Sequence, residues 1–404
     1  MGRFARLNFA SYLNLSMKTF LTCSALALAA AVPVAAQVGG AAVIFLQIEP
    51  DSRAAGMGNT GVAMADNANA IFWNPANLAG QRGAEFGFTH SEWLPELDAG
   101  LSYEYAVGKY NVPKVGTFGA HLTYLNLGKH TWTDNDGQEL GEFKSYDLSA
   151  GLSFGRKITR GLSAGVGMRY IYSNLAPGVT VEGQETQAGT ALAADFGLRY
   201  ASQPFKLGKI NTTFQAGANL ANFGPTIRYS KGGATADGGD SGDPIPTNLR
   251  FGWATTFNFD EFNSLTIAND FNKALYRVEV PRNDSGAVIG TRTVDSPFKA
   301  LFSSWKPLDV DLNVNDGKYE PTSVGALEQL TIGVGAEYWY NRLFAMRTGY
   351  FYENPNNGNR QFMTFGAGLR YNIVGVDFSY IYAIQEESPL ANTLRLSLLV
   401  NFLR

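Results

Sequence analysis

The sequence is poor in cysteine, in charged side chains and in long apolar runs. Its single cysteine is Cys23, and only 17% of the 404 residues are charged. Because Cys23 lies within the N-terminal signal that we expect to be removed, the mature chain has no disulfide, thiol nucleophile or thiolate metal site. The formal net charge of -3 offers no basic surface for nucleic acid. These absences exclude disulfide-stabilised and nucleic-acid-binding proteins.

The longest apolar run lies near the N-terminus. Lys18 precedes the apolar residues 20–32, and the small residues Val34, Ala35 and Ala36 follow. This order of positive, apolar and small-residue regions predicts a cleavable secretory signal over residues 1–36. The run is shorter than the roughly 20 residues that a membrane-spanning helix needs. Translation starts at Met1 or Met17, of which we favour Met17, and we expect the mature chain to begin near Gln37.

After residue 37, apolar residues alternate with polar or small ones. In the last segment Leu394, Leu396, Leu398, Val400 and Phe402 share one face, and Thr393, Arg395, Ser397 and Asn401 share the other. Such segments of about ten residues are typical of membrane β-barrels. A soluble sandwich would carry more charge on its exposed face, whereas here the polar face is largely Gly, Ser and Thr. We predict an all-β fold, a transmembrane β-barrel of antiparallel strands.

The charged residues within these segments all fall on the predicted inner face. They are Arg169, Asp195, Arg199, Arg250, Asp270, Glu337, Arg347, Arg370, Asp377 and Arg395. A lipid-facing charge near the bilayer midplane would cost about 2–4 kcal/mol, so we expect these charges in the lumen. Since both signs occur, we favour an ionic network that braces the barrel and its plug. A path for a substrate is the alternative.

Residues 37–82 have a different composition, in which small residues dominate. Glycines there permit close backbone approach, and Asn74-Pro75 supplies a turn. The segment predicts a compact N-terminal plug, with the barrel formed by residues 83–404. The motif residues of this plug are Arg53, Gly56, Gly58, Trp73, Asn74, Pro75 and Ala76.

Motifs for catalysis and metal binding are weak. Gly-x-Ser-x-Gly occurs around Ser153 and Ser163, but both serines lie within strand alternation, without the helix that a nucleophile elbow requires. His90, His121 and His130 lack paired metal-ligand spacing, and we expect them at rims or in loops. We predict no catalytic residue, metal site or cofactor.

The Trp-Asn-Pro-Ala motif at residues 73–76 resembles the FadL/OmpP1 group of barrels, and longer blocks resemble its PorV family. These blocks are residues 50–58, 246–250, 270–273, 335–341, 347–353, 358–360 and 389–395. The resemblance implies about 14 strands, an N-terminal plug, no enzymatic activity and a place in the outer membrane of a Gram-negative, Bacteroidota-type cell.

The resemblance also implies a function in the type IX protein secretion system. Proteins of this family are shuttles that bind the C-terminal signal domain of cargo at the translocon SprA (Sov). They deliver the cargo to the surface attachment complex that contains PorU. Candidate contact loops are residues 174–189, 231–243, 283–296 and 305–329, and outer-membrane lipid surrounds the barrel. Two alternatives stay open: a FadL-like channel for small hydrophobic molecules, and a purely structural barrel similar to PorQ.

Overall fold

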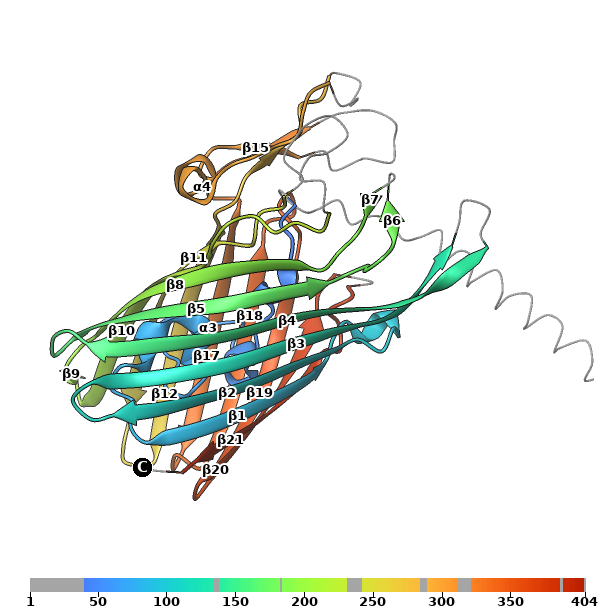
Figure 1. Ribbon diagram of the computed structural model, residues 1–404. Helices are drawn as coiled ribbons and strands as arrows, with labels where there is room; N and C mark the ends of the chain where they lie inside the picture. Colours follow the sequence, from blue (N-terminus) through green and yellow to red (C-terminus); the bar gives the residue numbers. More distant parts are fainter. Residues whose placement is uncertain are drawn as a thin grey trace, which may run out of the picture.

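The computed structural model describes residues 40–133, 138–181, 184–230, 242–283, 289–310, 321–385 and 388–402. The predicted signal, residues 1–36, lies outside the described residues. Fourteen antiparallel strands follow one another around a closed sheet, in which β21 pairs with β1 and β10 pairs with β11 (Figure 1). The predicted all-β barrel and its strand number are confirmed.

The strands of the barrel are β1 (Ala84–Glu92), β2 (Ser102–Val112), β3 (Gly116–Thr133), β4 (Glu139–Lys157), β5 (Leu162–Asn174), β8 (Gly189–Ala201), β10 (Ile210–Phe223), β11 (Asn248–Asn258), β12 (Asn263–Ala274), β17 (Leu330–Tyr340), β18 (Phe344–Glu353), β19 (Gln361–Tyr371), β20 (Val374–Ala383) and β21 (Leu394–Asn401). Their side chains alternate as predicted. On β21, Leu396 and Leu398 are exposed on the outside, while Arg395 and Ser397 are buried. This two-residue period separates a lipid-facing surface from an inner one.

The connections between strands differ at the two ends of the barrel. At one end they are short, as at residues 113–115, 341–343 and 372–373. At the other end they include residues 175–188, 224–247 and 275–329. In outer-membrane barrels the short turns face the periplasm and the long loops face outward, so we call these ends the lower and the upper rim. Among the described residues, no helix has the length and hydropathy to span a membrane.

Aromatic rings mark two levels on the outer wall. Toward the upper rim, Tyr124, Tyr146 and Tyr172 of β3, β4 and β5 form a row with ring centroids 5.7 and 6.0 Å apart. Toward the lower rim, Phe118 and Phe154 lie 4.9 Å apart. Aromatic belts of this kind occupy the two membrane–water interfaces of a barrel.

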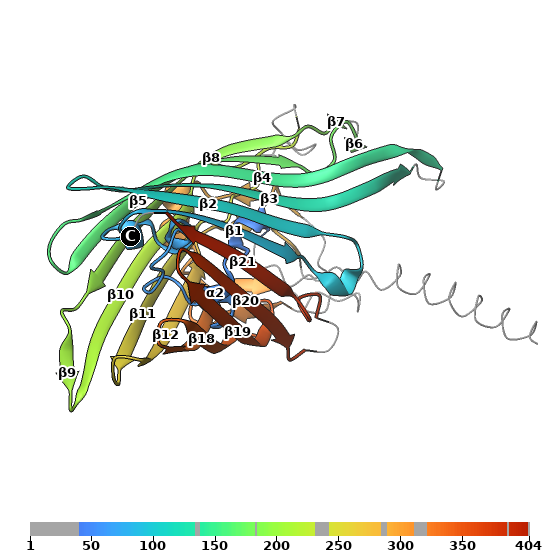
Figure 2. The same ribbon diagram turned by 90° about the horizontal axis from the view of Figure 1, so that it is seen from below.

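Residues 40–82, here called the N-terminal segment, lie inside the ring of strands (Figures 1 and 2). The segment contains η1 (Ile44–Gln47), α2 (Ser52–Ala55), α3 (Ala70–Trp73) and η2 (Pro75–Leu78). Near the upper rim the amide of Ala42 donates to the carbonyl of Pro244. At the lower rim Lys109 Nζ donates to the carbonyl of Arg82. The segment therefore runs the height of the barrel.

Several small elements lie beyond the barrel rims. At the upper rim are η3 (Pro95–Leu97), β6 (Thr180–Val181), β7 (Gln184–Glu185), β13 (Val278–Glu279), β14 (Thr293–Val294), α4 (Pro297–Ser303), β15 (Leu308–Val310) and β16 (Thr322–Val324). At the lower rim β9 (Phe205–Leu207) pairs with β10 alone and projects from the wall (Figure 2).

The ends of β3 and β4 extend past their neighbours at the upper rim (Figure 1). Pairing of β3 with β2 stops at Asn126, and pairing of β4 with β5 stops at Tyr146. Beyond that level β3 and β4 pair only with each other in the described part of the chain. We call residues 127–133 and 139–145 the β3–β4 ribbon. The strand alternation in the sequence did not predict this ribbon.

Candidate functional site

Glycine on both sides lets the N-terminal segment touch the barrel wall with its backbone. Gly58 has a φ of +65°, and a Cβ there would lie 2.6 Å from the carbonyl oxygens of Val334 and Tyr350. Its amide donates to Thr364 Oγ1 at 2.8 Å. On the wall, a Cβ on Gly349 would collide with the Gly58 amide. Only glycine fits this pair of facing positions.

A second glycine-lined contact holds residues 74–76 on the opposite part of the wall. The wall glycines whose Cβ would meet Asn74, Pro75 or Ala76 are Gly155, Gly165, Gly197 and Gly217 of β4, β5, β8 and β10. Asn74 Nδ2 donates to the carbonyls of Leu198 at 2.9 Å and Val62 at 3.2 Å. Its Oδ1 accepts from the amide of Ala76 at 3.0 Å and caps η2. The asparagine therefore joins the turn to the wall.

Two inner-face charges bind the backbone of the N-terminal segment. Arg250 Nη1 donates to the carbonyl of Phe72 at 2.8 Å, and its guanidinium lies 4.5 Å from the Phe72 ring. Asp270 accepts from the amides of Gly61 at 2.6 Å and Val62 at 2.9 Å. Both side chains are about 1–3% exposed. Charge-assisted hydrogen bonds to backbone groups therefore stabilise both buried side chains without an ion pair.

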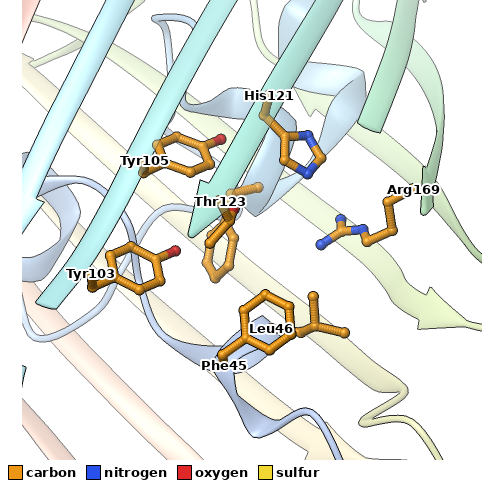
Figure 3. A pocket seen from close by; sticks show the side chains of 8 residues that line it. Phe45, Leu46, Tyr103, Tyr105, His121, Thr123 and Arg169 are labelled. Carbon is orange, nitrogen blue, oxygen red and sulfur yellow. The ribbon is translucent and has the colours of Figure 1, made fainter. Parts of the chain in front are cut away.

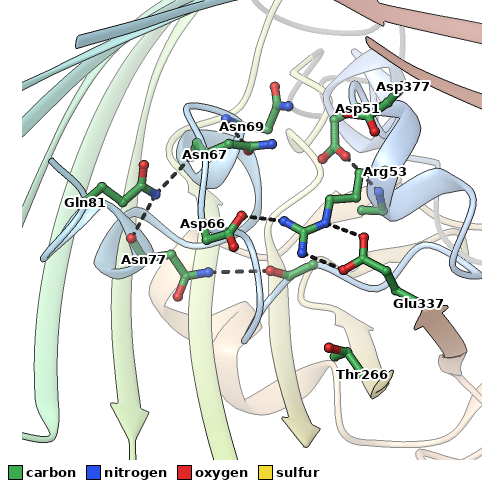
Figure 4. A network of polar contacts seen from close by, with 12 residues as sticks. Asp51, Arg53, Asp66, Asn67, Asn69, Asn77, Gln81, Thr266, Glu337 and Asp377 are labelled. Carbon is green, nitrogen blue, oxygen red and sulfur yellow. Dashed lines mark hydrogen bonds and ion pairs between the residues drawn. The ribbon is translucent and has the colours of Figure 1, made fainter. Parts of the chain in front are cut away.

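Arg53 connects the segment to the largest ion-pair network of the inner wall (Figure 4). Its Nε and Nη2 donate to the two carboxylate oxygens of Glu337 at 2.8 and 2.7 Å. Arg347 Nε donates to Glu337 at 2.7 Å, and its Nη1 donates to Asp377 at 2.8 Å. Arg370 extends the network, because its Nη2 donates to Asp377 Oδ2 at 2.5 Å. Arg53 also pairs with Asp66, a residue that was not among the predicted site residues.

The other predicted charges of the inner face lie apart from this network. Arg169 pairs with Asp195, and Asp195 also accepts from the amide of Asn222 at 2.7 Å. Arg199 donates to Gln215 at 2.7 Å. Arg395 is 1% exposed, and its Nη2 lies 4.0 Å from the Glu49 carboxylate. The alternation along each strand predicts that these side chains face inward, but it does not predict which residues they bind.

Trp73 is fixed by an acid that also begins a helix. Its Nε1 donates to Asp51 Oδ2 at 2.6 Å. Asp51 Oδ1 accepts from the amide of Ala54 at 2.7 Å, which makes Asp51 the N-cap of α2. An N-cap carboxylate satisfies amides that have no partner within the helix. One side chain thus links α2 to α3.

The cavity between η1 and β3 is small (Figure 3). It is lined by Phe45, Leu46, Phe72, Tyr103, Tyr105, His121, Thr123 and Arg169. Its volume open to a water-sized sphere is about 10 Å³, which is at the threshold for one water molecule. Tyr105 Oη and His121 Nδ1 have no hydrogen-bond partner among the described residues.

The position of His121 differs from the prediction. We expected it at a rim or in a loop, but it lies within β3 on the inner wall, with its ring stacked on Tyr105 at 6.0 Å. His130 lies on the β3–β4 ribbon, and His90 pairs with Glu104 near the upper end of β1. The prediction for His121 was wrong because its ring packs on Tyr105 and lines the cavity beside Phe45 and Phe72 of the N-terminal segment.

The upper rim carries an exposed apolar surface on and beside α4. Phe298 and Phe302 are 72% and 79% exposed, and Trp305 is 42% exposed. Asp295 precedes α4 and binds Lys299 and Ser303 at 2.6 and 2.5 Å. Partial burial opposes ionisation of Asp295, but hydrogen bonds from Lys299 and Ser303 outweigh it and lower the pKa of this carboxyl. Asp295 thus stays ionised and holds α4.

Comparison with protein families identifies the chain. The model of the family described as type IX secretion system protein PorV matches residues 34–282. The chain belongs to the PorV family. It is therefore an outer-membrane component of the type IX secretion system, and its family and barrel fold are those of a transport protein. No curated protein matches the chain.

Solved structures with a similar fold are also found. The toluene transporter TbuX of Ralstonia pickettii is 15% identical, with 88% of this chain and 98% of that chain covered and a TM-score of 0.45. The toluene transporter TodX of Pseudomonas putida is 14% identical, with 90% and 98% covered and a TM-score of 0.48. A Pseudomonas aeruginosa FadL homologue is 11% identical, with 87% and 98% covered and a TM-score of 0.41. Likenesses this distant transfer no ligand or activity to this chain.

Proposed function

We propose that this PorV family member is a shuttle of the type IX system. In this proposal it receives cargo by the C-terminal signal domain at the translocon SprA (Sov) and passes it to the attachment complex that contains PorU. The family match supports the secretion system as the setting. The observation that favours a shuttle over a pore is the N-terminal segment, whose backbone contacts the wall on both sides of the lumen.

The N-terminal segment acts as a plug in this proposal. The cavity between the segment and the wall (Figure 3) and a second cavity within the segment, beside Arg53, each have a volume of about 10 Å³ for a water-sized sphere. A folded cargo domain is far larger than either cavity. The inner charges brace the segment against the wall. Their ion pairs and their hydrogen bonds to the segment's backbone support this role. Cargo must therefore bind outside the lumen.

The β3–β4 ribbon is our candidate for part of the cargo-binding surface. Its strands rise above the rim, where no third strand pairs with either edge among the described residues. Unpaired strand edges can add a strand from a partner through backbone hydrogen bonds. Leu140 is 52% exposed and Trp132 is half-buried on the ribbon. These side chains would add apolar contact to the backbone pairing.

The first experiment deletes the gene and follows signal-bearing cargo. We expect cargo to be lost from the cell surface and to accumulate inside or be degraded. Co-purification of the intact protein from outer membranes is expected to recover SprA, PorU or cargo. Normal surface delivery in the deletion strain contradicts the shuttle function.

The second experiment shortens the ribbon in the full chain. Residues 129–144 are replaced by Asn-Gly, which suits a two-residue hairpin turn. We expect normal barrel assembly, read from heat-dependent gel mobility, and loss of co-purified cargo. The control replaces Lys129 and Glu142, an ion pair 3.7 Å apart on the ribbon, with alanine. This control keeps both strand edges and should keep cargo. Cargo retention by the shortened chain rejects the ribbon as a binding surface.

The alternative is a FadL-like channel for small hydrophobic molecules. It requires an apolar pocket beside the N-terminal segment, and Phe45, Leu46 and Phe72 do line the cavity of Figure 3. That cavity is at the threshold for one water molecule, whereas ligand pockets span about 300–1,000 Å³. Loss of fatty-acid or hydrocarbon uptake in the deletion strain, with secretion intact, would favour the channel.

A further inference from the structure

Helix α4 presents an aromatic face that is largely exposed in the described part of the chain. Phe298 and Phe302 are four residues apart and therefore lie on the same side of the helix. Their side chains are 72% and 79% exposed. Trp305 lies two residues beyond the end of the helix and is 42% exposed. Three neighbouring aromatic side chains in water are unusual for a soluble surface and indicate contact with another apolar phase.

The face of α4 is continuous with the lipid-facing wall of the barrel. The Phe298 ring packs edge-on against the ring of Phe223, with centroids 5.0 Å apart. Phe223 is the last residue of β10 and lies opposite Ala194 of β8. On β8 the residues on that same face, Leu192 and Phe196, are 55% and 50% exposed on the outside of the barrel. The aromatic face of α4 thus begins where the lipid-facing surface ends.

Polar contacts hold α4 in this place. Arg277, next to the top of β12, donates to the carbonyl of Ser303 at 3.3 Å. Ser303 Oγ lies 2.5 Å from Asp295. Trp305 Nε1 donates to the carbonyl of Leu301 at 3.0 Å and closes the C-terminal end of the helix. The helix is therefore fixed before it meets a partner. Figure 1 shows α4 just beyond the upper ends of the strands.

We propose that α4 inserts its aromatic face into the outer leaflet of the membrane and anchors the β12–β17 connection to lipid. Phe298 and Phe302 would enter the acyl-chain boundary beside Phe223. Trp305 suits the interface, because its ring is apolar and its N–H already donates to Leu301. Lys306 is exposed next to Trp305 and would face anionic head groups. Lys299, 70% exposed on the helix, is already paired with Asp295.

The choice of lipid over a protein partner rests on position. A face that docks a protein would be equally effective anywhere on the upper rim, whereas this one meets the lipid-facing wall at Phe223. Aromatic rings flanked by lysine are also the composition of interfacial helices. A protein partner is then an outcome of the test below. The proposal does not depend on the shuttle function.

The test uses the purified full chain with a single introduced cysteine. Cys23 is the only cysteine and lies in the predicted signal, so the mature protein with Phe302→Cys carries one thiol for an NBD fluorophore. The protein is reconstituted into phosphatidylcholine–phosphatidylglycerol vesicles with or without lipid carrying a nitroxide at acyl carbon 5. We expect a blue-shifted emission, at least twofold quenching by the nitroxide lipid and little quenching by aqueous iodide.

Two positions calibrate the measurement. Leu396→Cys, on the lipid-facing side of β21, should be quenched by the nitroxide lipid alone. Thr131→Cys, exposed on the β3–β4 ribbon, should be quenched by iodide alone. A Phe302→Cys label that matches Thr131→Cys overturns the proposal and leaves the face for a protein partner. A label that neither quencher reaches overturns it too, because α4 is then covered by its own chain.

A second variant separates insertion from damage to the fold. Phe298→Ser is combined with Phe302→Cys, and barrel assembly is checked by heat-dependent gel mobility. If α4 is seated through both rings, quenching by the nitroxide lipid should fall by about half while the barrel remains assembled. Unchanged quenching in an assembled barrel would mean that the aromatic face does not seat the helix.

Discussion

Replacing Glu337 with glutamine tests the ion-pair network directly. Glu337 is 1% exposed and accepts three charge-assisted hydrogen bonds, two from Arg53 and one from Arg347, at 2.7–2.8 Å. Glutamine keeps the shape but removes the charge, and its amide group must face a guanidinium donor. Removing one partner of a buried ion pair costs about 3–5 kcal/mol. Part of this cost is spared, because Arg53 keeps Asp66 and Arg347 keeps Asp377. We therefore expect a loss of about 2–4 kcal/mol in the free energy of unfolding.

The assay is urea unfolding in detergent micelles, combined with hydrogen exchange. We expect faster amide exchange in residues 52–66, because Arg53 holds this part of the N-terminal segment to the wall. The matched control is Glu104→Gln on the outside of β2, where Glu104 binds His90 and is 30% exposed. An exposed pair of this kind contributes about 0–1 kcal/mol. Equal effects of the two substitutions, or unchanged exchange in residues 52–66, would refute the assigned role of Glu337.

Three further substitutions test other contacts by the same unfolding assay. Gly349→Val should lower the free energy of unfolding by about 1–3 kcal/mol and speed amide exchange around Gly58, because the new Cβ would collide with the Gly58 amide. The control Thr348→Val, on the lipid-facing side of the same strand, should change the free energy of unfolding by less than about 0.5 kcal/mol. Asn74→Ala should cost about 2–4 kcal/mol, since it removes three hydrogen bonds worth about 1 kcal/mol each. Arg395→Met should be neutral or stabilising by about 1 kcal/mol, because this buried guanidinium leaves Nε and Nη1 without partners among the described residues; a loss above about 2 kcal/mol would contradict that argument.

The two faces of the barrel could be predicted from the sequence because a strand has a period of two. Leu396 and Arg395 are neighbours in the chain, yet one lies on the lipid-facing surface and the other is buried. The free-energy cost of a charge in lipid assigns the charged face to the inner wall and the apolar face to the lipid. Arg169 and Asp377 could be placed on the inner wall in the same way. For these residues, the strand alternation and the free energy of transferring a charge into lipid are enough to predict the face on which each side chain lies.

The partners of the inner charges could not be predicted, because they depend on strand register and on a segment outside the strands. Arg347 reaches Glu337 because β17 and β18 pair those two residues directly, and it reaches Asp377 across β19. Arg250, by contrast, binds the carbonyl of Phe72. Nothing in the alternation distinguishes Arg250 from Arg347. The difference arises where the N-terminal segment passes each side chain.

The β3–β4 ribbon escaped prediction for a related reason. Above Asn126 the alternation fades, and charged residues such as Lys129 and Glu142 lie where lipid-facing apolar residues would be needed. Such a pattern resembles a loop, although cross-strand pairing continues to Thr133. A strand that leaves the membrane loses the lipid that imposes its sequence signature. Strand length and membrane thickness therefore have to be predicted separately.

The contacts of the N-terminal segment explain why we place function outside the lumen. Arg53 ties the segment to β17, and Asn74 ties it to β8 on another part of the wall. Releasing it would break both sets of contacts and leave Glu337 buried with one partner fewer. By the magnitudes above, that release costs several kcal/mol before any cargo or ligand contributes. The ribbon and α4 can bind a partner without this cost, since their edges and aromatic face are already exposed. A partner with modest affinity can therefore use the upper rim, whereas one that uses the lumen must first offset the cost of opening it.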